Sequence, residues 1–333
     1  MNRIRALLSP VAAFRFAAAL LAMALAGAPC AAAQPAARVP RVALLAERSP
    51  PDRMAAAFVD ALRALGYVEG RNVVVDIRYG GGDLDRYPAL ATELARAGAD
   101  VIVVGGSVAA AAARAASSTV PIVFTSVSDP VAMGLVASLA RPGGNLTGIS
   151  NIVADLAGKQ LELLHLARPG MTRVAVLHNP RNSTPALDAT RKAALALSLT
   201  ILPLPIRNAG DIAPAFVRAA NARADAVLAL SDPVLGNATA EMAARAIAHR
   251  MPAIYARSEF VDQGGLMAYG PDFAESYRRA ATYVDRILKG TPPGELAVEQ
   301  PTTFELVVNL RTARELGLKL PPALLQRATR VIE

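Results

Sequence analysis

Residues 101–109 read VIVVGGSVA: an unbroken run of β-branched apolar residues, two glycines, a serine and the start of an alanine-rich stretch. A continuous apolar run of this length is typical of a strand buried on both faces, as the inner strands of a parallel sheet are. The alanine-rich residues 108–116 that follow predict a helix. This strand–helix unit is the element from which helix-covered parallel sheets are built.

The same alternation extends from this unit in both directions. On the N-terminal side, Met54, Phe58, Leu62 and Leu65 recur at helical spacing and predict one buried helix stripe. Up to the glycine-rich turn at 141–145, strands are predicted at 42–46, 73–79, 101–104 and 122–125, and helices at 52–65, 83–97, 108–116 and 131–140.

A second series of units begins beyond the turn. Its predicted strands are 174–177, 200–204, 226–230, 253–255 and 266–269, and its predicted helices are 156–167, 185–197, 212–222, 239–250 and a final one carrying Tyr277, Ala281, Val284 and Leu288. Residues 291–294 (TPPG) are expected to form a linker. Two such series predict an α/β fold of two doubly wound parallel-sheet lobes joined by a hinge.

The N-terminus carries the parts of a secretory signal peptide. Arg3, Arg5 and Arg15 precede an apolar run at 16–28, and AAA at 31–33 precedes Gln34. The run is shorter than the roughly 20 residues that span a bilayer. We therefore expect residues 1–33 to be a signal peptide, cleaved near Ala33, and the mature chain to reside in the periplasm.

The only cysteine is Cys30, inside this segment. A lipoprotein would carry its anchor on such a cysteine, but Pro29 stands where a small residue is required, which argues against a lipid anchor. A chain cleaved after Cys30 has no disulfide and no thiolate chemistry.

Several classes of function lack their sequence signatures. The formal net charge of +8 is spread along the chain without a long basic run, which argues against a nucleic-acid partner. The first strand-to-helix turn, LAERSPP (45–51), lacks the glycines of a dinucleotide site. Neither 143–148 nor 105–109 completes a phosphate-binding loop or a nucleophile elbow. Three histidines without a partnering cysteine make no metal pattern. We expect no catalytic residue, no metal and no cofactor.

Polar residues follow the predicted strands at the edge where open parallel sheets bind ligands. In the first series these are GGS (105–107) and TSVSDP (125–130), and in the second HNP (178–180) and SDP (231–233). Hydroxyls and backbone amides at the start of a helix suit an anion. Such residues are also ordinary helix caps, so both interpretations stay open for each of them.

From these strand ends we predict a ligand site between the lobes. Ser107, Ser126 and Ser128 are expected to donate to a ligand carboxylate. Asp232 is expected to hold the positively charged end. Asn179 and Tyr269 are expected nearby.

Longer stretches resemble one family. They are GYVEGRN (66–72), PIVF (121–124) leading to SDP (128–130), LVASLARPGGNLTG (135–148), GGLMAYGP (264–271), YRRAA (277–281) and VEQPT (298–302). Together they are similar to the ABC transporter substrate-binding family that includes tryptophan- and tyrosine-binding lipoproteins. The resemblance covers residues 41 to 333.

The resemblance implies a type I periplasmic-binding fold, a small-molecule ligand in a cleft between hinged lobes, and partner permease and ATPase subunits at the membrane. With that fold we expect lobe 1 to hold residues 41–147 and 258–289, and lobe 2 residues 148–257 and 290–333, with crossings near 144–149, 256–259 and 290–293. We expect a monomer that is not an enzyme. YARSEF (255–260) is less aromatic than the family's usual form, so the resemblance does not fix an aromatic ligand.

An amino acid or related carboxylate is the expected ligand, and a carboxylate without an amine is the alternative. The absence of Trp argues against a sugar. Two other functions stay open: an enzyme on the same sheets, which lacks an activated nucleophile or cofactor loop, and a sensor that signals to a membrane receptor. Permease and ATPase genes beside this one would separate an importer from a sensor.

Overall fold

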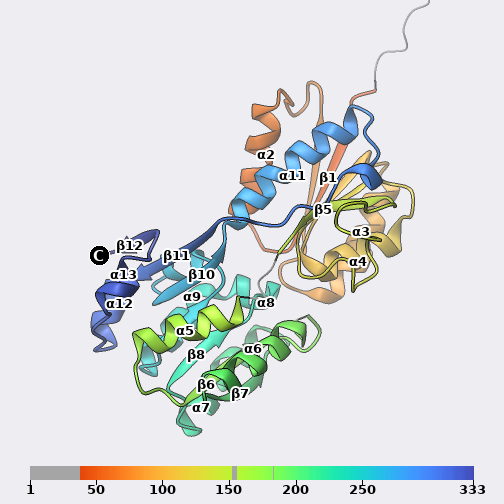
Figure 1. Cartoon of the computed structure of the whole chain (residues 1–333). Helices are drawn as coiled ribbons and strands as arrows, with labels where there is room; N and C mark the ends of the chain where they lie inside the picture. The colour runs from red at the N-terminus through yellow and green to blue at the C-terminus, as the bar shows by residue number, and fades with distance from the viewer. Residues whose placement is uncertain (1–37, 152–155, 183) are drawn as a thin grey trace, which may run out of the picture. The chain divides into compact units, whose positions relative to one another are not determined.

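The computed structural model describes residues 38–151, 156–182 and 184–333, which form two helix-covered sheets (Figure 1). The first sheet has five strands in the order β2-β1-β3-β4-β5, and every pairing in it is parallel. Its strands are β1 (Arg41–Ala46), β2 (Val74–Tyr79), β3 (Val101–Gly105), β4 (Ile122–Val127) and β5 (Leu146–Ser150). We call this sheet with its helices lobe 1.

The strands of lobe 1 bury both faces. Along β1, Val42, Leu44 and Ala46 pack in one core, whereas Ala43 and Leu45 pack in the opposite one. The first core is covered by α2 (Arg53–Ala64) and α11 (Phe273–Leu288), and the second by η1 (Leu84–Arg86), α3 (Tyr87–Arg96) and α4 (Gly106–Ala116).

The second sheet has seven strands in the order β12-β11-β10-β9-β8-β6-β7, and only the pair β10–β11 is antiparallel. Its strands are β6 (Arg173–His178), β7 (Thr200–Pro205), β8 (Ala226–Ala229), β9 (Ala253–Tyr255), β10 (Met267–Pro271), β11 (Phe304–Asn309) and β12 (Arg330–Ile332). We call this sheet with its helices lobe 2.

Helices also cover both faces of lobe 2. One face is covered by α5 (Ala157–Ala167), α6 (Thr184–Ala196), α12 (Leu310–Glu315) and α13 (Pro322–Leu325). The other is covered by α7 (Ile212–Asn221), α8 (Pro233–Asn237), α9 (Thr239–Ala248) and α10 (Glu259–Asp262). Two short 3-10 turns, η2 (Ala209–Asp211) and η3 (Pro293–Glu295), complete the described elements.

The predicted fold class is confirmed: both sheets are parallel-dominated and each is wound on two sides. The helix predicted at 131–140 is wrong, because those residues form a series of turns. Gly134 takes a φ of +64°, and the amides of Leu135 and Val136 both donate to the carbonyl of Pro130. A left-handed residue in the middle of the segment ends any helix started by Asp129.

The chain passes between the lobes at other places than expected. Residues 146–150 form β5, so the first crossing follows Ser150 instead of lying at 144–149. Gly148 lets β5 approach β4, since a Cβ there would lie 2.0 Å from the carbonyl oxygen of Phe124. Strand β10 pairs with β9 and β11 in lobe 2, whereas 258–289 as a whole was expected in lobe 1.

Only α11 of that segment packs in lobe 1, so the second crossing lies at Asp272 instead of 256–259. The third crossing also comes later than 290–293. Glu299 is still bonded to β5, since its amide donates to Gly148 O at 3.0 Å and its carbonyl accepts from Ser150 N at 2.9 Å. The passage into lobe 2 is therefore at residues 300–303, just before β11.

Candidate functional site

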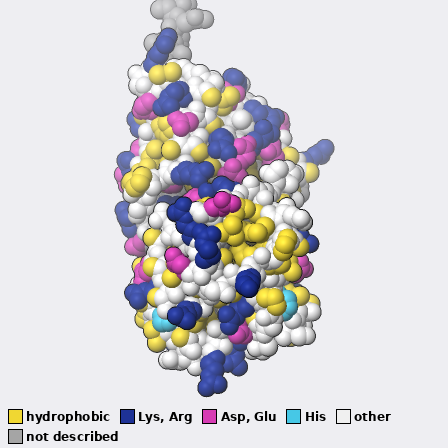
Figure 2. Space-filling model, turned by 90° about the vertical axis from the view of Figure 1, so that its left-hand side faces the viewer, with side chains coloured by type: hydrophobic (Ala, Val, Ile, Leu, Met, Phe, Trp, Pro, Cys, Tyr) yellow, Lys and Arg dark blue, Asp and Glu magenta, His cyan; other side chains and the backbone are white. Residues whose placement is uncertain are grey.

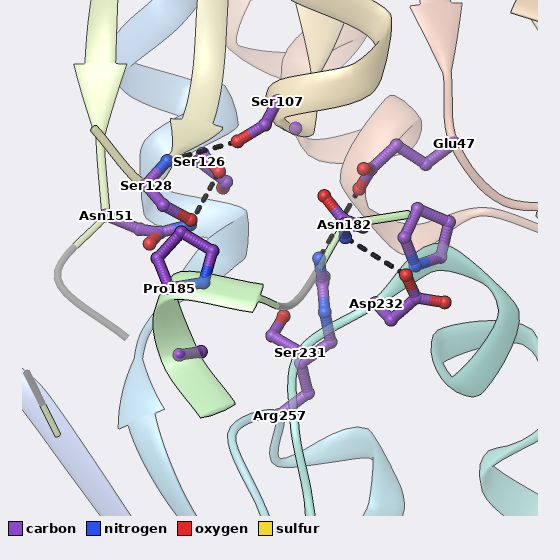
Figure 3. A pocket seen from close by; sticks show the side chains of 13 residues that line it. Glu47, Ser107, Ser126, Ser128, Asn151, Asn182, Pro185, Ser231, Asp232 and Arg257 are labelled. Atoms are coloured by element: carbon purple, nitrogen blue, oxygen red, sulfur yellow. Dashed lines mark hydrogen bonds and ion pairs between the residues drawn. The ribbon is translucent and has the colours of Figure 1, made fainter. Parts of the chain in front are cut away.

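A cavity of about 40 Å³ lies between the two lobes at the carboxyl ends of their strands (Figure 3). That is where open parallel sheets bind ligands. It is lined by Glu47, Gly106, Ser107, Ser126, Ser128 and Asn151 of lobe 1, and by Asn182, Pro185, Ala186, Ser231, Asp232, Pro233 and Arg257 of lobe 2. The volume admits only a few water molecules, so the two walls stand close together and the lobes must move apart to admit a larger ligand.

The wall of lobe 1 is built around the start of α4 and the end of β4. Gly105, at the N-cap of α4, has no side chain to cap the helix. The hydroxyl of Ser107 accepts a hydrogen bond from the amide of Ser128 at 3.3 Å, which ties the two strand ends together. The first turn of this eleven-residue helix favours a negatively charged group, and the Glu47 carboxylate lies beside it, since a Cβ on Gly106 would lie 2.0 Å from Glu47 Oε1.

Ser126 is the strained residue of this wall. Its φ is +59°, at a point where the register between β4 and β5 shifts. Its carbonyl accepts from the side-chain amide of Asn151 at 2.5 Å, while its buried hydroxyl has no hydrogen-bond partner among the described residues. Strained residues of this kind occur at ligand sites, where the surrounding structure holds them.

Asp232 is the central group of the lobe 2 wall. It is 3% exposed, and its Oδ1 accepts from the amide of Val234 at 2.8 Å, which caps α8. Its Oδ2 accepts from the side-chain amide of Asn182 at 3.0 Å. Burial raises the pKa of Asp232, and these hydrogen bonds only partly oppose that rise.

A buried ion pair joins the two walls. Arg257 Nη2 lies 3.5 Å from Glu47 Oε2, and the guanidinium lies 3.9 Å from the ring centre of Phe273. Arg257 Nε is buried without a hydrogen-bond partner among the described residues. Burial raises the pKa of Glu47, and Arg257 opposes the rise. The cavity therefore holds two carboxyl groups and one guanidinium, which suits a ligand that carries both charges.

Comparison with known proteins decides the family. The family model described as ABC transporter substrate binding protein matches residues 42–332, nearly the whole of the two lobes. The chain belongs to this family. It is therefore a solute-binding component of the ABC-transporter type.

Individual relatives agree with this assignment. A tyrosine-binding protein of Clostridioides difficile is 25% identical over 280 residues, which cover 84% of this chain and 80% of the relative. A conserved domain protein of Vibrio cholerae superposes with a TM-score of 0.83 at 29% identity, covering 88% of this chain and 100% of that one. An ABC domain from Streptococcus pneumoniae in complex with L-Trp gives 0.82 at 24% identity, covering 88% and 99%.

The cavity of this substrate-binding protein brings together four of the six predicted site residues: Ser107, Ser126, Ser128 and Asp232. Asn179 and Tyr269 do not line it. Asn179 is fully buried: its side chain hydrogen-bonds to Asp232, and its Oδ1 accepts from the amide of Arg181 at 3.0 Å. Tyr269 packs with the α5 side of the lobe 2 core, and its ring centre lies 6.3 Å from that of Phe304.

Sequence reasoning missed four polar lining residues, Glu47, Asn151, Asn182 and Arg257, and it noted Ser231 at a strand end without including it in the predicted site. Glu47 and Arg257 come within two residues of the ends of β1 and β9, so the strand-end rule applied to every strand would have found them. Asn151 was hidden because β5 was interpreted as a hinge. Asn182 lies in the turn before α6, and only its bond to Asp232 reveals it.

No helix among the described residues is long and apolar enough to cross a bilayer. Nor do the described residues contain a group of three or more His, Cys, Asp or Glu side chains placed to hold a metal ion.

Proposed function

We propose that this protein captures an amino acid or a related small carboxylate between its lobes and presents it to the permease and ATPase of an importer. The observation that carries the proposal is the chemistry of the two cleft walls. Lobe 1 supplies hydroxyls and a helix start without a side-chain cap, and lobe 2 supplies a buried carboxylate. These groups face one another across a narrow gap.

In this proposal the ligand carboxylate lies against lobe 1. Ser107, Ser126 and Ser128 donate hydrogen bonds to it. The buried hydroxyl of Ser126 supports this placement, because it has no partner among the described residues and leaving a buried donor unpaired is costly.

The ammonium group lies toward Asp232 and Glu47. Both carboxyl groups are buried, and one guanidinium balances only one of them. A bound cation would offset the remaining negative charge. A carboxylate without an amine would leave that charge unmatched, so we favour an amino acid over the alternative. The tyrosine-binding relative supports the same class of ligand.

The side chain of the ligand is less closely defined. No aromatic ring is among the lining residues that the structure describes. This supports recognition of the ligand's ammonium and carboxylate groups by polar residues, with its side chain selected by the shape of the cavity.

The remaining parts of the proposal concern partners and place. We propose that the chain is exported by its signal peptide at 1–33, acts as a monomer, needs no cofactor and is not an enzyme. Basic and acidic side chains are interspersed over the face drawn in Figure 2, which supports a partner other than nucleic acid. Mass spectrometry of the protein recovered from the periplasm should show a mature N-terminus close to Gln34; an intact Met1 or a lipid on Cys30 would contradict export in this form.

A thermal-shift screen tests the ligand class. L-amino acids, their amides and their deaminated acids are compared at equal concentration. A true ligand at a hundred times its Kd stabilises the folded state by about 2.7 kcal/mol. We expect a shift with one or more amino acids, a smaller shift with the matching acid, and the smallest with the amide. Sugars and nucleotides are included for comparison, and a screen in which only these shift the transition would overturn the proposal.

A further inference from the structure

The first strand-to-helix turn of lobe 1 contacts lobe 2 through three consecutive residues. Glu47 pairs with Arg257 at 3.5 Å, Arg48 Nη1 lies 3.1 Å from Glu259 Oε1, and the amide of Ser49 donates to Asn237 Oδ1 at 3.1 Å. All three residues follow β1 directly, and their partners lie in α8, in α10 and in the loop before α10.

The two ion pairs have opposite polarity. On lobe 1 the acidic Glu47 is followed by the basic Arg48. On lobe 2 the basic Arg257 is followed, two residues later, by the acidic Glu259. Charges of alternating sign attract in this one register and repel in the shifted one. The two ion pairs therefore favour contact between the lobes and also select one register for that contact.

The two pairs differ in their relation to the cavity. Glu47 and Arg257 line it, whereas Arg48 and Glu259 do not. The side chains of Arg48 and Glu259 are only 18% and 14% exposed, so water screens their attraction little. Among the described residues, this is the most buried ion pair that joins the two lobes outside the ligand cavity.

We propose that Arg48 and Glu259 are positioning residues: their ion pair holds the lobes in the closed arrangement and so sets ligand affinity without touching the ligand. This deepens the proposed function and rests on it for the ligand. A protein whose binding-competent form is only partly populated binds more weakly in proportion to that population. Losing the pair shifts the lobes toward separation and lowers affinity.

The chain supplies a matched control. Arg181 Nη2 and Asp85 Oδ1 also join lobe 2 to lobe 1, at 2.7 Å, but their side chains are 52% and 77% exposed. Exposed pairs contribute little because water screens them and both side chains lose freedom. The control therefore has the same chemistry and crosses between the same lobes, and it differs in burial.

The experiment combines two measurements on the full chain. Calorimetry with L-tyrosine, the amino acid in the relative's name, gives affinity, and small-angle scattering without added amino acid gives the radius of gyration. We expect Arg48→Gln to weaken binding about tenfold and Arg48→Glu to weaken it further and enlarge the radius. The reversal Arg48→Glu with Glu259→Arg should restore both. Asp85→Asn should change affinity less than about twofold.

The outcomes separate the two proposals. If Arg48→Glu matches the wild type in both affinity and radius, or if the reversal restores neither, the positioning role is overturned. If the wild type binds neither L-tyrosine nor any other amino acid, yet Arg48→Glu enlarges the radius and the reversal restores it, the positioning role stands and the proposed ligand class fails.

Discussion

The two walls of the cleft occupy equivalent places, at the carboxyl ends of parallel strands, yet they supply different chemistry. Lobe 1 presents hydroxyls on Ser107, Ser126 and Ser128 around the start of α4. Lobe 2 presents Asp232 and Arg257, both nearly inaccessible to water. Equivalent positions in two similar sheets have thus become a hydroxyl wall, in which Glu47 is the one acid, and a charged wall that supplies both an acid and a base.

The two walls also differ in what they do for the fold. Asp232 caps α8, and Arg257 neutralises Glu47 and stacks on Phe273. The hydroxyl of Ser126 makes no hydrogen bond to the described residues. Changes at Asp232 or Arg257 should therefore lower both stability and affinity, whereas loss of the Ser126 hydroxyl should lower affinity alone.

The largest effect is expected from Arg257→Gln. Removing the guanidinium leaves the buried Glu47 carboxylate without its partner, which typically costs about 3 kcal/mol of unfolding free energy. Because burial already raises the pKa of Glu47, the folded protein holds its proton to higher pH than the unfolded chain does. The folded state is therefore favoured below pH 4.5, the ordinary pKa, and loses that advantage as pH rises through the folded pKa.

Urea unfolding at pH 5 and pH 8 measures this. The loss in Arg257→Gln should be clearly larger at pH 8, and adding Glu47→Gln should recover most of it. An equal loss at both pH values would show that packing on Phe273, and not charge, is what Arg257 supplies.

Asp232→Ala should weaken amino-acid binding about tenfold to a hundredfold, since a hydrogen bond to a charge contributes about 1.5–3 kcal/mol. It should also cost about 1 kcal/mol of stability through the lost cap of α8. Asp232→Asn separates the two effects. Its amide oxygen still caps, and Asn182 can turn its own amide to match, but the charge is gone.

Calorimetry and urea unfolding on both variants check this prediction. We expect Asp232→Asn to lose affinity as Asp232→Ala does while keeping nearly wild-type stability. Unchanged affinity in both variants, with stability lost only in Asp232→Ala, would return Asp232 to the role of a helix cap.

The charged wall also shows how far sequence reasoning reaches. The buried run of β3 and the periodic helices predicted both sheets, because burial on two faces leaves a plain apolar pattern. The terminal strands β11 and β12 escaped, since neither is bounded by turn residues that mark a strand. The turns at 131–140 were mistaken for a helix because their apolar residues happen to fall at helical spacing.

The site was predictable where a residue directly follows a strand, and unpredictable where tertiary contacts place it. Ser107 and Ser128 lie within two residues beyond the ends of β3 and β4, Ser126 is the second-last residue of β4, and all three line the cavity. Arg257 does lie two residues beyond β9, but its pairing with Glu47, 210 positions away, is a tertiary contact. No local pattern encodes such a pairing. The strand-end rule does not apply to Tyr269, because this residue lies inside β10 and its ring faces the α5 side of the sheet.

Lowering the pH should weaken the binding of the ligand ammonium by Glu47 and Asp232. Burial raises the pKa of Glu47 and of Asp232, so both begin to take protons at higher pH than ordinary carboxyl groups. As pH falls from 8 toward 5, the affinity for an amino acid should drop, by about tenfold for every 1.4 kcal/mol of ammonium binding that is lost. The affinity for the matching deaminated acid should not fall and should rise, because protonation removes the repulsion between these carboxyl groups and the ligand carboxylate. Calorimetric titrations across this range compare the two ligands, and parallel losses would remove the carboxyl groups from ammonium binding.

The smallest effects are expected at Ser126, and they test the hydroxyl wall. Ser126→Ala and Ser126→Gly both remove the hydroxyl, which the fold does not use among its described hydrogen bonds. Each should weaken amino-acid binding by roughly tenfold or less, because one donor to the carboxylate is lost. The two should differ in stability, since the φ of +59° strains alanine and suits glycine. Ser126→Gly should be about 1 kcal/mol more stable than Ser126→Ala in urea unfolding. Wild-type affinity in both variants would take the hydroxyl out of the ligand site, and with it the reason for holding a serine in a strained conformation at the end of β4.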